Sequence, residues 1–312
     1  MTRTVKIILC ALAVLIAAGV TLYPLLSNRY AEKTKSLIET QYTEAIQQLD
    51  ESELIAAREA AHEYNTTLVN VTDKAFSKEA LIRASESYDT LLNIRGDGLM
   101  GYVEIPKISV NLPIYHGTGE DSLGRGIGHL LGSSLPVGGS ATHCILTGHS
   151  GLAREKMFSD LDQLEKGDIF FLHVLNETLA YMVQDMYTVL PEDTSHLMIE
   201  GQHDYCTLIT CTPFGVNTHR LLIRGERVEY TAATELVESA EYTDVPEAVP
   251  STWTDAYLRG LLYGLLAVSG IGGGLLLYKR CHKPRRRRRH RARHYAPIRW
   301  PWRRKRGKHE AR

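Results

Sequence analysis

Residues 207–215 read TLITCTPFG, a short apolar run that ends in a cysteine and is followed by proline and glycine. A run of this kind is typical of a β-strand, and the proline after it cannot continue the strand. Cys211 is therefore expected at the mouth of a sheet. A thiol in that position is either a nucleophile or a small buried hydrophobic group, and this segment alone does not choose between them.

A histidine occupies a similar position in an earlier segment, ATHCILTGHSG at residues 141–151. Residues 142–147 are a strand candidate, and Gly148 begins the turn that carries His149. A cysteine thiol with a pKa of about 8.5 is mostly protonated at neutral pH, so a catalytic cysteine needs a basic or cationic partner. His149 is the candidate for that partner. The histidines show no HExxH or similar spacing, so no zinc site is expected.

Two arginines on the strand candidate after Cys211 could face a developing oxyanion. Arg220 and Arg224 lie four residues apart, which is roughly 13 Å along a strand. The short loop 212–219 returns the chain beside the end of the preceding strand. In an antiparallel return the start of the new strand lies beside that end, so Arg220 is predicted to lie near the thiol and Arg224 farther away.

Short strand candidates punctuated by proline and glycine lie on both sides of these segments. Many short strands with little helix indicate a mostly-β barrel or sandwich. The further candidates are residues 101–108, 111–116, 169–175 and 179–189, with a hairpin near Asn176-Glu177 and one helical stretch at 154–164.

Composition divides the chain into six segments. Residues 29–65 are rich in Ala, Glu, Gln and Leu without Gly or Pro, which predicts helix. The segments are an N-terminal transmembrane anchor at 1–27, a helical segment at 28–98, the β-rich domain at 99–229, an irregular linker at 230–255, a second transmembrane helix at 256–278 and a basic tail at 279–312.

The two predicted membrane-spanning helices rest on apolar runs at residues 5–26 and 257–278. Each run is long enough to cross a hydrocarbon core of roughly 30 Å. A cleaved signal peptide is the alternative for the first run. That run continues past the small residues that could form a cleavage site, which favours an uncleaved anchor.

The charge of the chain is distributed unevenly. Lys and Arg number 36, as do Asp and Glu, yet residues 279–312 hold 17 basic residues and one acidic residue. Lys and Arg accumulate on the cytoplasmic side of membrane spans, so both termini are predicted to be cytoplasmic and residues 28–255 to lie outside the cell membrane. The tail is expected to contact anionic lipid; a nucleic-acid-binding arm is the less favoured alternative.

These residues together resemble the sortase family. The run TLITC matches the TLxTC signature, Thr147-Gly148-His149 resembles the segment that bears the sortase histidine, and Arg220 follows the cysteine by nine residues, as the sortase arginine does. The runs GYVEIPKI, LPIYHGT, GIGHLLGSSLPVGG and TCTPFGVNTHRLLIRG look like the class C, pilin-polymerising branch. The resemblance covers residues 98–227 and implies an eight-stranded sortase-type β-barrel.

The resemblance implies a cysteine transpeptidase with His149, Cys211 and Arg220 as its catalytic residues and no cofactor. Its expected partners are pilin subunits that carry an LPxTG-like sorting signal and an acceptor lysine, together with membrane lipid but no nucleic acid. One alternative is a sortase that anchors surface proteins to peptidoglycan. Another is a non-enzymatic membrane scaffold, which leaves the three residues unexplained.

Class C sortases commonly carry an N-terminal lid with an Asp-Pro-aromatic motif over the active site. The corresponding stretch here is VTDKAF at residues 71–76. Asp73 and Phe76 are present, whereas the proline is absent and the spacing is longer. A lid is therefore expected from its position in the chain.

Cys144 and Cys206 lie five residues before His149 and Cys211, respectively. On adjacent, parallel, in-register strands, as the resemblance implies, the two thiols are neighbours, and the odd offset puts them on the face opposite the catalytic pair. They either form a disulfide or pack as free thiols. Directly paired residues on parallel strands suit disulfide geometry poorly, which favours free thiols.

Overall fold

The computed structural model describes residues 3–69, 85, 87–150, 155–239 and 258–264, and a few residues between 266 and 278. The chain divides into two units, residues 1–261 and 262–312. The first unit contains the barrel and its associated helices. Of the second unit, the structure describes only short helical pieces.

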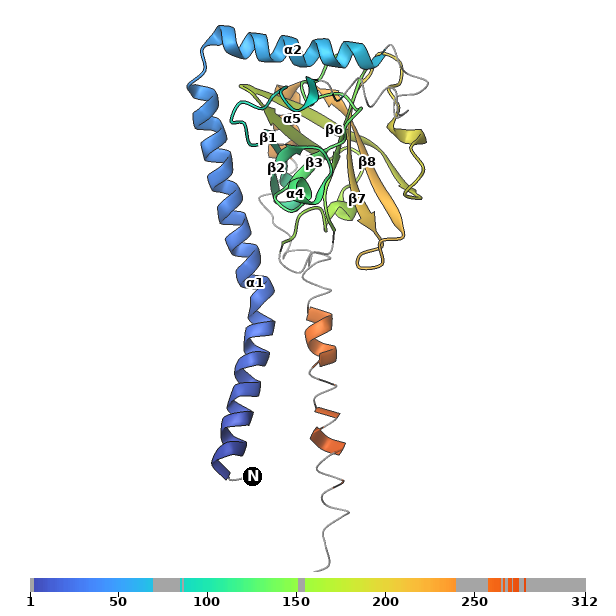
Figure 1. Ribbon diagram of the computed structural model, residues 1–312. Helices are drawn as coiled ribbons and strands as arrows, with labels where there is room; N and C mark the ends of the chain where they lie inside the picture. The colour runs from blue at the N-terminus through green and yellow to red at the C-terminus, as the bar shows by residue number, and fades with distance from the viewer. Residues whose placement is uncertain are drawn as a thin grey trace, which may run out of the picture. The chain divides into compact units, whose positions relative to one another are not determined.

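Eight strands in the described part of the chain form one closed barrel (Figure 1). Their order around the barrel is β1-β2-β3-β4-β7-β8-β6-β5. Only β2 with β3 and β4 with β7 are parallel neighbours among these strands. The strands are β1 (Leu99–Ile105), β2 (Val110–His116), β3 (Ile127–His129), β4 (Thr142–Thr147), β5 (Ile169–Val174), β6 (Glu177–Val189), β7 (Asp204–Thr212) and β8 (His219–Val228).

The eight-stranded, mostly-β barrel expected from the sequence is thus confirmed. Short helical turns connect several strands, and three of these four turns each bury one apolar side chain: Ile108, Leu161 or Leu197. They are η2 (Pro106–Ile108), α4 (Glu120–Leu123), η3 (Leu161–Gln163) and η4 (Ser195–Leu197).

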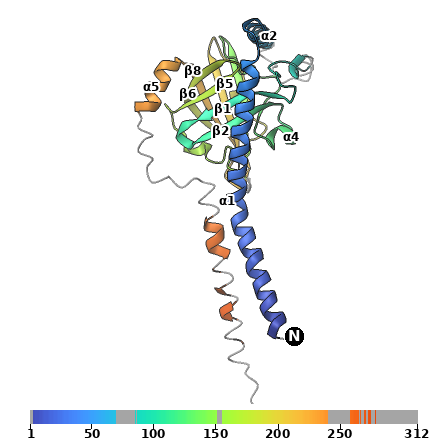
Figure 2. The same cartoon turned by 90° about the vertical axis from the view of Figure 1, so that its left-hand side faces the viewer.

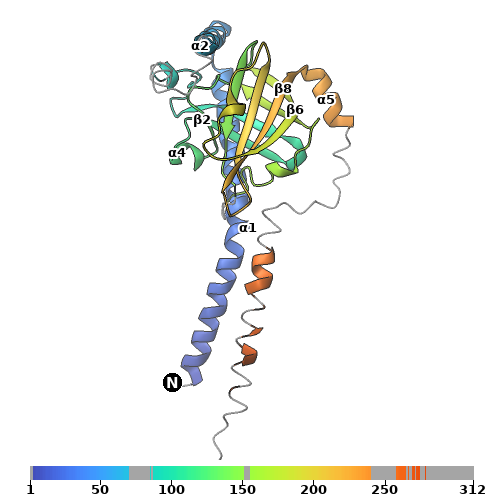
Figure 3. The ribbon, with the colours of Figure 1, turned by 90° about the vertical axis from the view of Figure 1, so that its right-hand side faces the viewer.

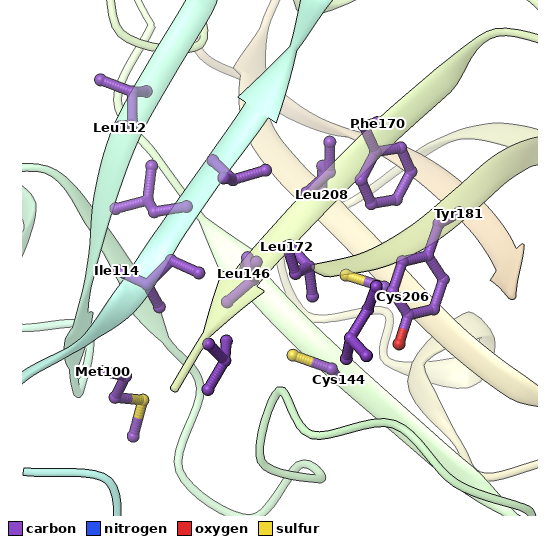
Figure 4. Close-up of a cluster of buried hydrophobic side chains, with 14 of the residues drawn as sticks. Met100, Leu112, Ile114, Cys144, Leu146, Phe170, Leu172, Tyr181, Cys206 and Leu208 are labelled. Atoms are coloured by element: carbon purple, nitrogen blue, oxygen red, sulfur yellow. The ribbon is translucent and has the colours of Figure 1, made fainter. Parts of the chain in front are cut away.

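The two faces of β4 and β7 bury different sets of side chains, because side chains alternate along a strand. Leu146 and Leu208 point into the barrel interior with Cys144 and Cys206 (Figure 4). Ile145 and Ile209, one residue on from Cys144 and Leu208, belong to a second apolar cluster with Leu197 and Leu222. The sheet therefore carries a packed core on one face and a smaller apolar surface on the other.

Two helices precede the barrel, where the sequence predicted a single helix over residues 29–65. Helix α1 (Arg3–Gln47) ends before Asp50, and α2 (Glu51–Val69) begins directly after it. The Asp50 carboxylate accepts a hydrogen bond from the Glu53 amide at 2.9 Å, and the Glu53 carboxylate accepts one from the Asp50 amide at 2.9 Å. This reciprocal capping box starts a new helix.

Helix α1 runs beside β1 and β2 (Figure 2) and is joined to the barrel by Tyr42. The buried Tyr42 hydroxyl donates to the Met100 carbonyl at 2.8 Å and accepts from the Leu175 amide at 2.8 Å. Burial raises the pKa of Tyr42 well above its usual value, so the hydroxyl stays protonated and can serve both partners. One side chain thus ties the helix to the backbone at two places on the barrel.

Residues 230–239 correct the sequence prediction, which assigned residues 230–255 to an irregular linker. Helix α5 (Tyr230–Ser239) lies beside β6 (Figure 3). Its Ala233 is fully buried and joins an apolar cluster that includes Phe171 and Ala180. The Thr-rich sequence of this segment has a low intrinsic helix propensity, so the helix was not predicted. It forms because the outer barrel face covers its narrow apolar stripe.

The helix predicted at residues 154–164 is also wrong in the described part of that range. Only the short turn η3 forms there. Met157 adopts a left-handed backbone conformation with φ of 45°, which interrupts an α-helix. The amide of Phe158 donates to the His149 carbonyl at 3.0 Å, across to the end of β4. Through this hydrogen bond, the segment contacts the turn that carries His149.

No helix among the described residues combines the length and the hydropathy needed to cross a membrane. The two predicted transmembrane helices are therefore not supported by the described part of the chain.

Candidate active site

Cys211 lies near the end of β7, at the rim of the barrel, and is partly exposed. Its side chain shares the outer face of the strand with Ile209, whereas Thr210 faces the opposite way and is buried. The loop after β7 then returns the chain as β8. The thiol is thus at the mouth of the sheet, as the sequence predicted.

Arg220 is the cross-strand partner of Cys211 in the antiparallel pair β7–β8. Residues directly opposite each other have Cβ atoms about 4.5–5.5 Å apart and lie on the same face. The Arg220 guanidinium donates to the carbonyls of His219, at 3.0 Å, and Asn217, at 3.3 Å. Within the described residues no carboxylate pairs with it, so its positive charge remains available to a ligand oxygen.

His149 follows β4, which runs parallel to β7 with Thr147 paired to Ile209. Extending this register by two residues brings His149 level with Cys211. The Gly148 amide donates to the Ile209 carbonyl at 2.9 Å. The register therefore continues past the end of β4 and places the histidine beside the cysteine.

Two side chains missed by the sequence analysis hold the backbone around His149. The Thr210 hydroxyl donates to the Gly148 carbonyl at 3.0 Å. The Phe158 ring would lie 2.7 Å from a Cβ at Gly148, so only glycine permits this close packing. Thr210 could have been found as a polar residue at an inward-facing position of the β7 alternation. Phe158 had no such signal.

An apolar groove of about 300 Å³ opens on the outer face of the barrel and reaches Arg220. Its floor is made by outward-facing side chains of β4, β7 and β8 and by a residue of the β6–β7 loop. The floor includes Ile145, Ile209, Leu222 and Leu197, and the wall includes Pro191, Asp193 and Thr194. Since Arg220 is the cross-strand partner of Cys211, one end of this apolar groove lies near the cysteine.

Arg224, the other candidate for the oxyanion-facing arginine, is paired with Thr207 and not with Cys211. Its guanidinium binds the carboxylates of Asp185, at 2.8 Å, and Glu200, at 3.2 Å. The predicted positions are therefore confirmed: Arg220 lies near the thiol, and Arg224 lies farther along the strand.

Cys144 and Cys206 are paired in register and buried as free thiols. They lie inside the barrel (Figure 4), opposite the face that carries Cys211. Burial raises the pKa of the Cys206 thiol far above its usual value. These two cysteines are therefore core residues in this structure, as the sequence analysis favoured.

Asp73 and Phe76, the predicted lid residues, lie outside the described residues. Among the residues that the structure does describe, no group of three or more His, Cys, Asp or Glu side chains could hold a metal ion.

The fold and site together define a cysteine-dependent barrel enzyme, with a thiol, an imidazole and a guanidinium at three adjacent strand ends. The chain belongs to the sortase family. A model described as "Sortase domain" matches residues 103–228. Sortase D from Bacillus subtilis (strain 168) is 34% identical over 131 residues, which cover 41% of this chain and 63% of that protein.

Solved class C sortases resemble the chain over more of their own length. Sortase C1 from Streptococcus agalactiae is 44% identical with a TM-score of 0.58, covering 62% of this chain and 98% of that one. Clostridium perfringens sortase C, solved with its C-terminal cell wall sorting motif, is 41% identical with a TM-score of 0.54, covering 62% and 99%. A sortase C from Streptococcus pneumoniae, whose structure is described as informing pilin substrate specificity, is also 41% identical, with a TM-score of 0.55 and coverage of 62% and 97%.

Proposed function

We propose that this sortase polymerises pilin subunits: it cleaves an LPxTG-like sorting signal and transfers the acyl group to a lysine of another pilin. The observation that carries the proposal is the register of three strands, which aligns His149, Cys211 and Arg220 at the end of an apolar groove. The likeness to class C sortases supports pilin as the substrate class.

In the first half-reaction, the Cys211 thiolate attacks the carbonyl carbon that precedes the glycine of the sorting signal. A cationic His149 beside the sulfur stabilises the thiolate. Arg220 donates hydrogen bonds to the oxyanion as negative charge moves onto the carbonyl oxygen. The C–N bond then breaks, His149 protonates the departing glycine amine, and a thioester remains on Cys211.

In the second half-reaction, a lysine amine attacks the thioester carbon. The new C–N bond replaces the C–S bond, neutral His149 takes a proton from the amine, and the thiolate is regenerated. The product is an isopeptide bond between two pilins. The three side chains supply a nucleophile, a proton carrier and an anion binder.

The localisation is likewise proposed, from the sequence alone. The apolar runs at 5–26 and 257–278 would anchor the chain in the cell membrane, with the barrel outside and both termini in the cytoplasm. Such an arrangement would present the groove to secreted pilins. Asp73 and Phe76 are proposed to belong to a lid over this site.

Cys211→Ala tests the catalytic assignment. Purified wild-type protein mixed with an LPxTG-type peptide is expected to gain the mass of the acyl group. Cys211→Ala is expected to gain none, because the other cysteines of the barrel, Cys144 and Cys206, are buried in the core. Cys206→Ala is the matched control and should still form the thioester, since Cys206 faces the core. A peptide trapped covalently by the Cys211→Ala protein would contradict the assignment.

The amine that accepts the acyl group distinguishes pilin polymerisation from the alternative function, the anchoring of surface proteins to peptidoglycan. The acyl-enzyme is offered a pilin that carries its acceptor lysine, a pilin whose acceptor lysine is replaced by arginine, and a cell-wall amine. Ladders of high molecular weight that need the lysine would support the proposal. Transfer to the cell-wall amine alone would favour anchoring.

A further inference from the structure

The loop that joins β6 to β7, residues 190–203, forms one wall of the groove. It contributes Pro191, Asp193 and Thr194 to the wall and Leu197 to the apolar floor. Apart from the single turn η4, this loop has no regular structure. Its position therefore depends on side-chain contacts with the barrel.

Arg224 makes the first of these contacts. It projects from the outer face of β8, is 7% exposed, and donates to the Glu200 carboxylate of the loop at 3.2 Å. The same guanidinium donates to Asp185 at 2.8 Å and to the Tyr187 hydroxyl at 2.9 Å, both on β6. One buried cation thus joins the loop to the strand from which the loop departs.

Aromatic rings hold the Arg224 guanidinium in place. Its central carbon lies 4.8 Å from the centroid of the Tyr205 ring and 5.3 Å from that of Tyr187. The planar guanidinium can stack on rings and bind two acids at once, which a lysine ammonium cannot do. The contacts with two carboxylates and two rings therefore require the planar shape of the Arg224 guanidinium as well as its positive charge.

His143 makes the second contact, from the outer face of β4. Its side chain is buried, and its Nδ1 donates to the Met198 carbonyl of the loop at 2.8 Å. Its Nε2 accepts from the Thr207 hydroxyl at 2.7 Å, which fixes the ring and the tautomer. The loop is therefore held at Met198 and Glu200, immediately after Leu197.

We propose that Arg224 and His143 are positioning residues that fix the 190–203 loop and thereby set the affinity for the apolar part of the sorting signal. Neither side chain lines the groove; each acts through the loop that places Leu197 on the groove floor. The inference rests on the proposed function, because it concerns recognition of the same substrate. It predicts an effect on substrate binding that is separate from the chemical step at Cys211.

Glu200→Gln and Arg224→Lys in the full-length chain test this inference. Glu200 is exposed, so its substitution weakens the loop contact without disturbing the barrel. We expect KM for an LPxTG-type peptide to rise about three- to tenfold in both variants, with kcat within twofold of the wild-type value, since uniform binding is what is lost. In a Cys211→Ala background, the Kd of the same peptide is expected to rise by the same factor.

Glu226→Gln is the matched control. Glu226 lies on β8, two residues beyond Arg224, and pairs with the half-exposed His203 at 2.7 Å, at the far end of the loop from the groove. Its KM is expected to stay within twofold of the wild-type value. Hydrogen exchange without peptide gives a second measurement: amides of residues 190–200, the part of the loop that includes the groove wall, should exchange faster in Glu200→Gln and Arg224→Lys than in the control, whose lost contact is at His203.

The outcomes separate this inference from the proposed function. Unchanged KM and Kd in both variants, or a fall in kcat alone, would overturn the positioning role. Unchanged exchange in residues 190–200 would show that Arg224 and Glu200 do not hold the loop. A wild-type protein that neither binds nor cleaves the peptide would overturn the proposed function and the recognition role, and the exchange experiment would still decide whether Arg224 and Glu200 hold the loop.

Discussion

At the scale of single residues, Arg220 and Arg224 of β8 differ in what their positive charge already contacts. Arg220 binds only backbone carbonyls within the described residues, whereas Arg224 is held by two carboxylates. Only the first has charge to offer to an oxyanion beside Cys211. The position opposite the nucleophile, together with this free charge, suits Arg220 to a catalytic role.

Arg220→Lys is therefore expected to lower kcat by about 100-fold, the usual order of loss when one oxyanion-stabilising donor is removed. Lysine keeps the charge but lacks the fork that can hold a carbonyl oxygen in two places. The measurement is steady-state transpeptidation with matched thermal unfolding curves. Arg227→Lys, on the same strand and 3.9 Å from Asp204, is the control and should retain kcat. A larger kcat loss in Arg224→Lys than in Arg220→Lys would reverse the assignment.

His143 makes stability depend on pH. Burial, with a smaller contribution from Arg224, lowers its pKa to about 4, against about 6.5 in an unfolded chain. Between these values the unfolded state binds more protons, so stability is complete above pH 6.5 and is lost as the pH falls toward 4. The loss amounts to about 3 kcal/mol at most.

His143→Asn should flatten that slope, as measured by the unfolding free energy at a series of pH values from 7 to 4.5. Asparagine can still donate to the Met198 carbonyl but does not titrate. Some slope will remain, because burial also lowers the pKa of His116. An unchanged slope in the variant would show that His143 is not the group responsible.

At the scale of elements, the sequence predicted the strands more accurately than the helices. Residues 142–147 were expected as a strand and form β4 with the same bounds. A short apolar and β-branched run bounded by glycine is a local signal for a strand, and in β4 this run is buried on both faces. The strand signal therefore arises from local sequence.

Helix α5 and the Met157 turn could not be predicted in the same way. Each depends on a tertiary contact, either an outer barrel face for Ala233 or the His149 carbonyl for Phe158. The active site shows the same division. The sequence predicted Cys211, His149 and Arg220 as the candidate catalytic residues, whereas the groove and its loop depend on which strands become neighbours.

Helix α1 is attached to the barrel by a contact that can be removed without changing the helix. Tyr42→Phe should lower the unfolding free energy by about 2–4 kcal/mol, because the buried Met100 carbonyl and Leu175 amide both lose a partner. Chemical denaturation measures the change. Tyr30→Phe is the control, since Tyr30 is on the same helix and 76% exposed, and should change stability by less than about 0.5 kcal/mol. Equal losses in the two variants would contradict the role assigned to Tyr42.

At the scale of the whole molecule, the distribution of charge along the chain predicts which parts lie in the cytoplasm. The strongest signal is in residues 279–312, with 17 basic residues and one acidic residue directly after the apolar run 257–278. Basic residues close to a span determine its orientation, while acidic residues and long loops contribute little. The barrel segment, with 16 acidic and 8 basic residues at 99–229, is therefore compatible with export.

We expect an epitope placed after Arg312 to be reached by antibody only after the cells are made permeable, whereas an antibody against the barrel should bind intact cells stripped of their wall. The physical reason is that moving a cluster of arginines across the membrane costs far more than leaving it beside anionic lipid headgroups. Replacing Arg285–Arg289 with glutamine tests the cause, because it should raise the fraction of molecules whose tag is reached from outside. The same tag moved to the N-terminus is the internal comparison and should also stay hidden. A C-terminal tag accessible in intact cells would contradict the orientation, and it would leave the barrel on the wrong side of the membrane for a pilin substrate.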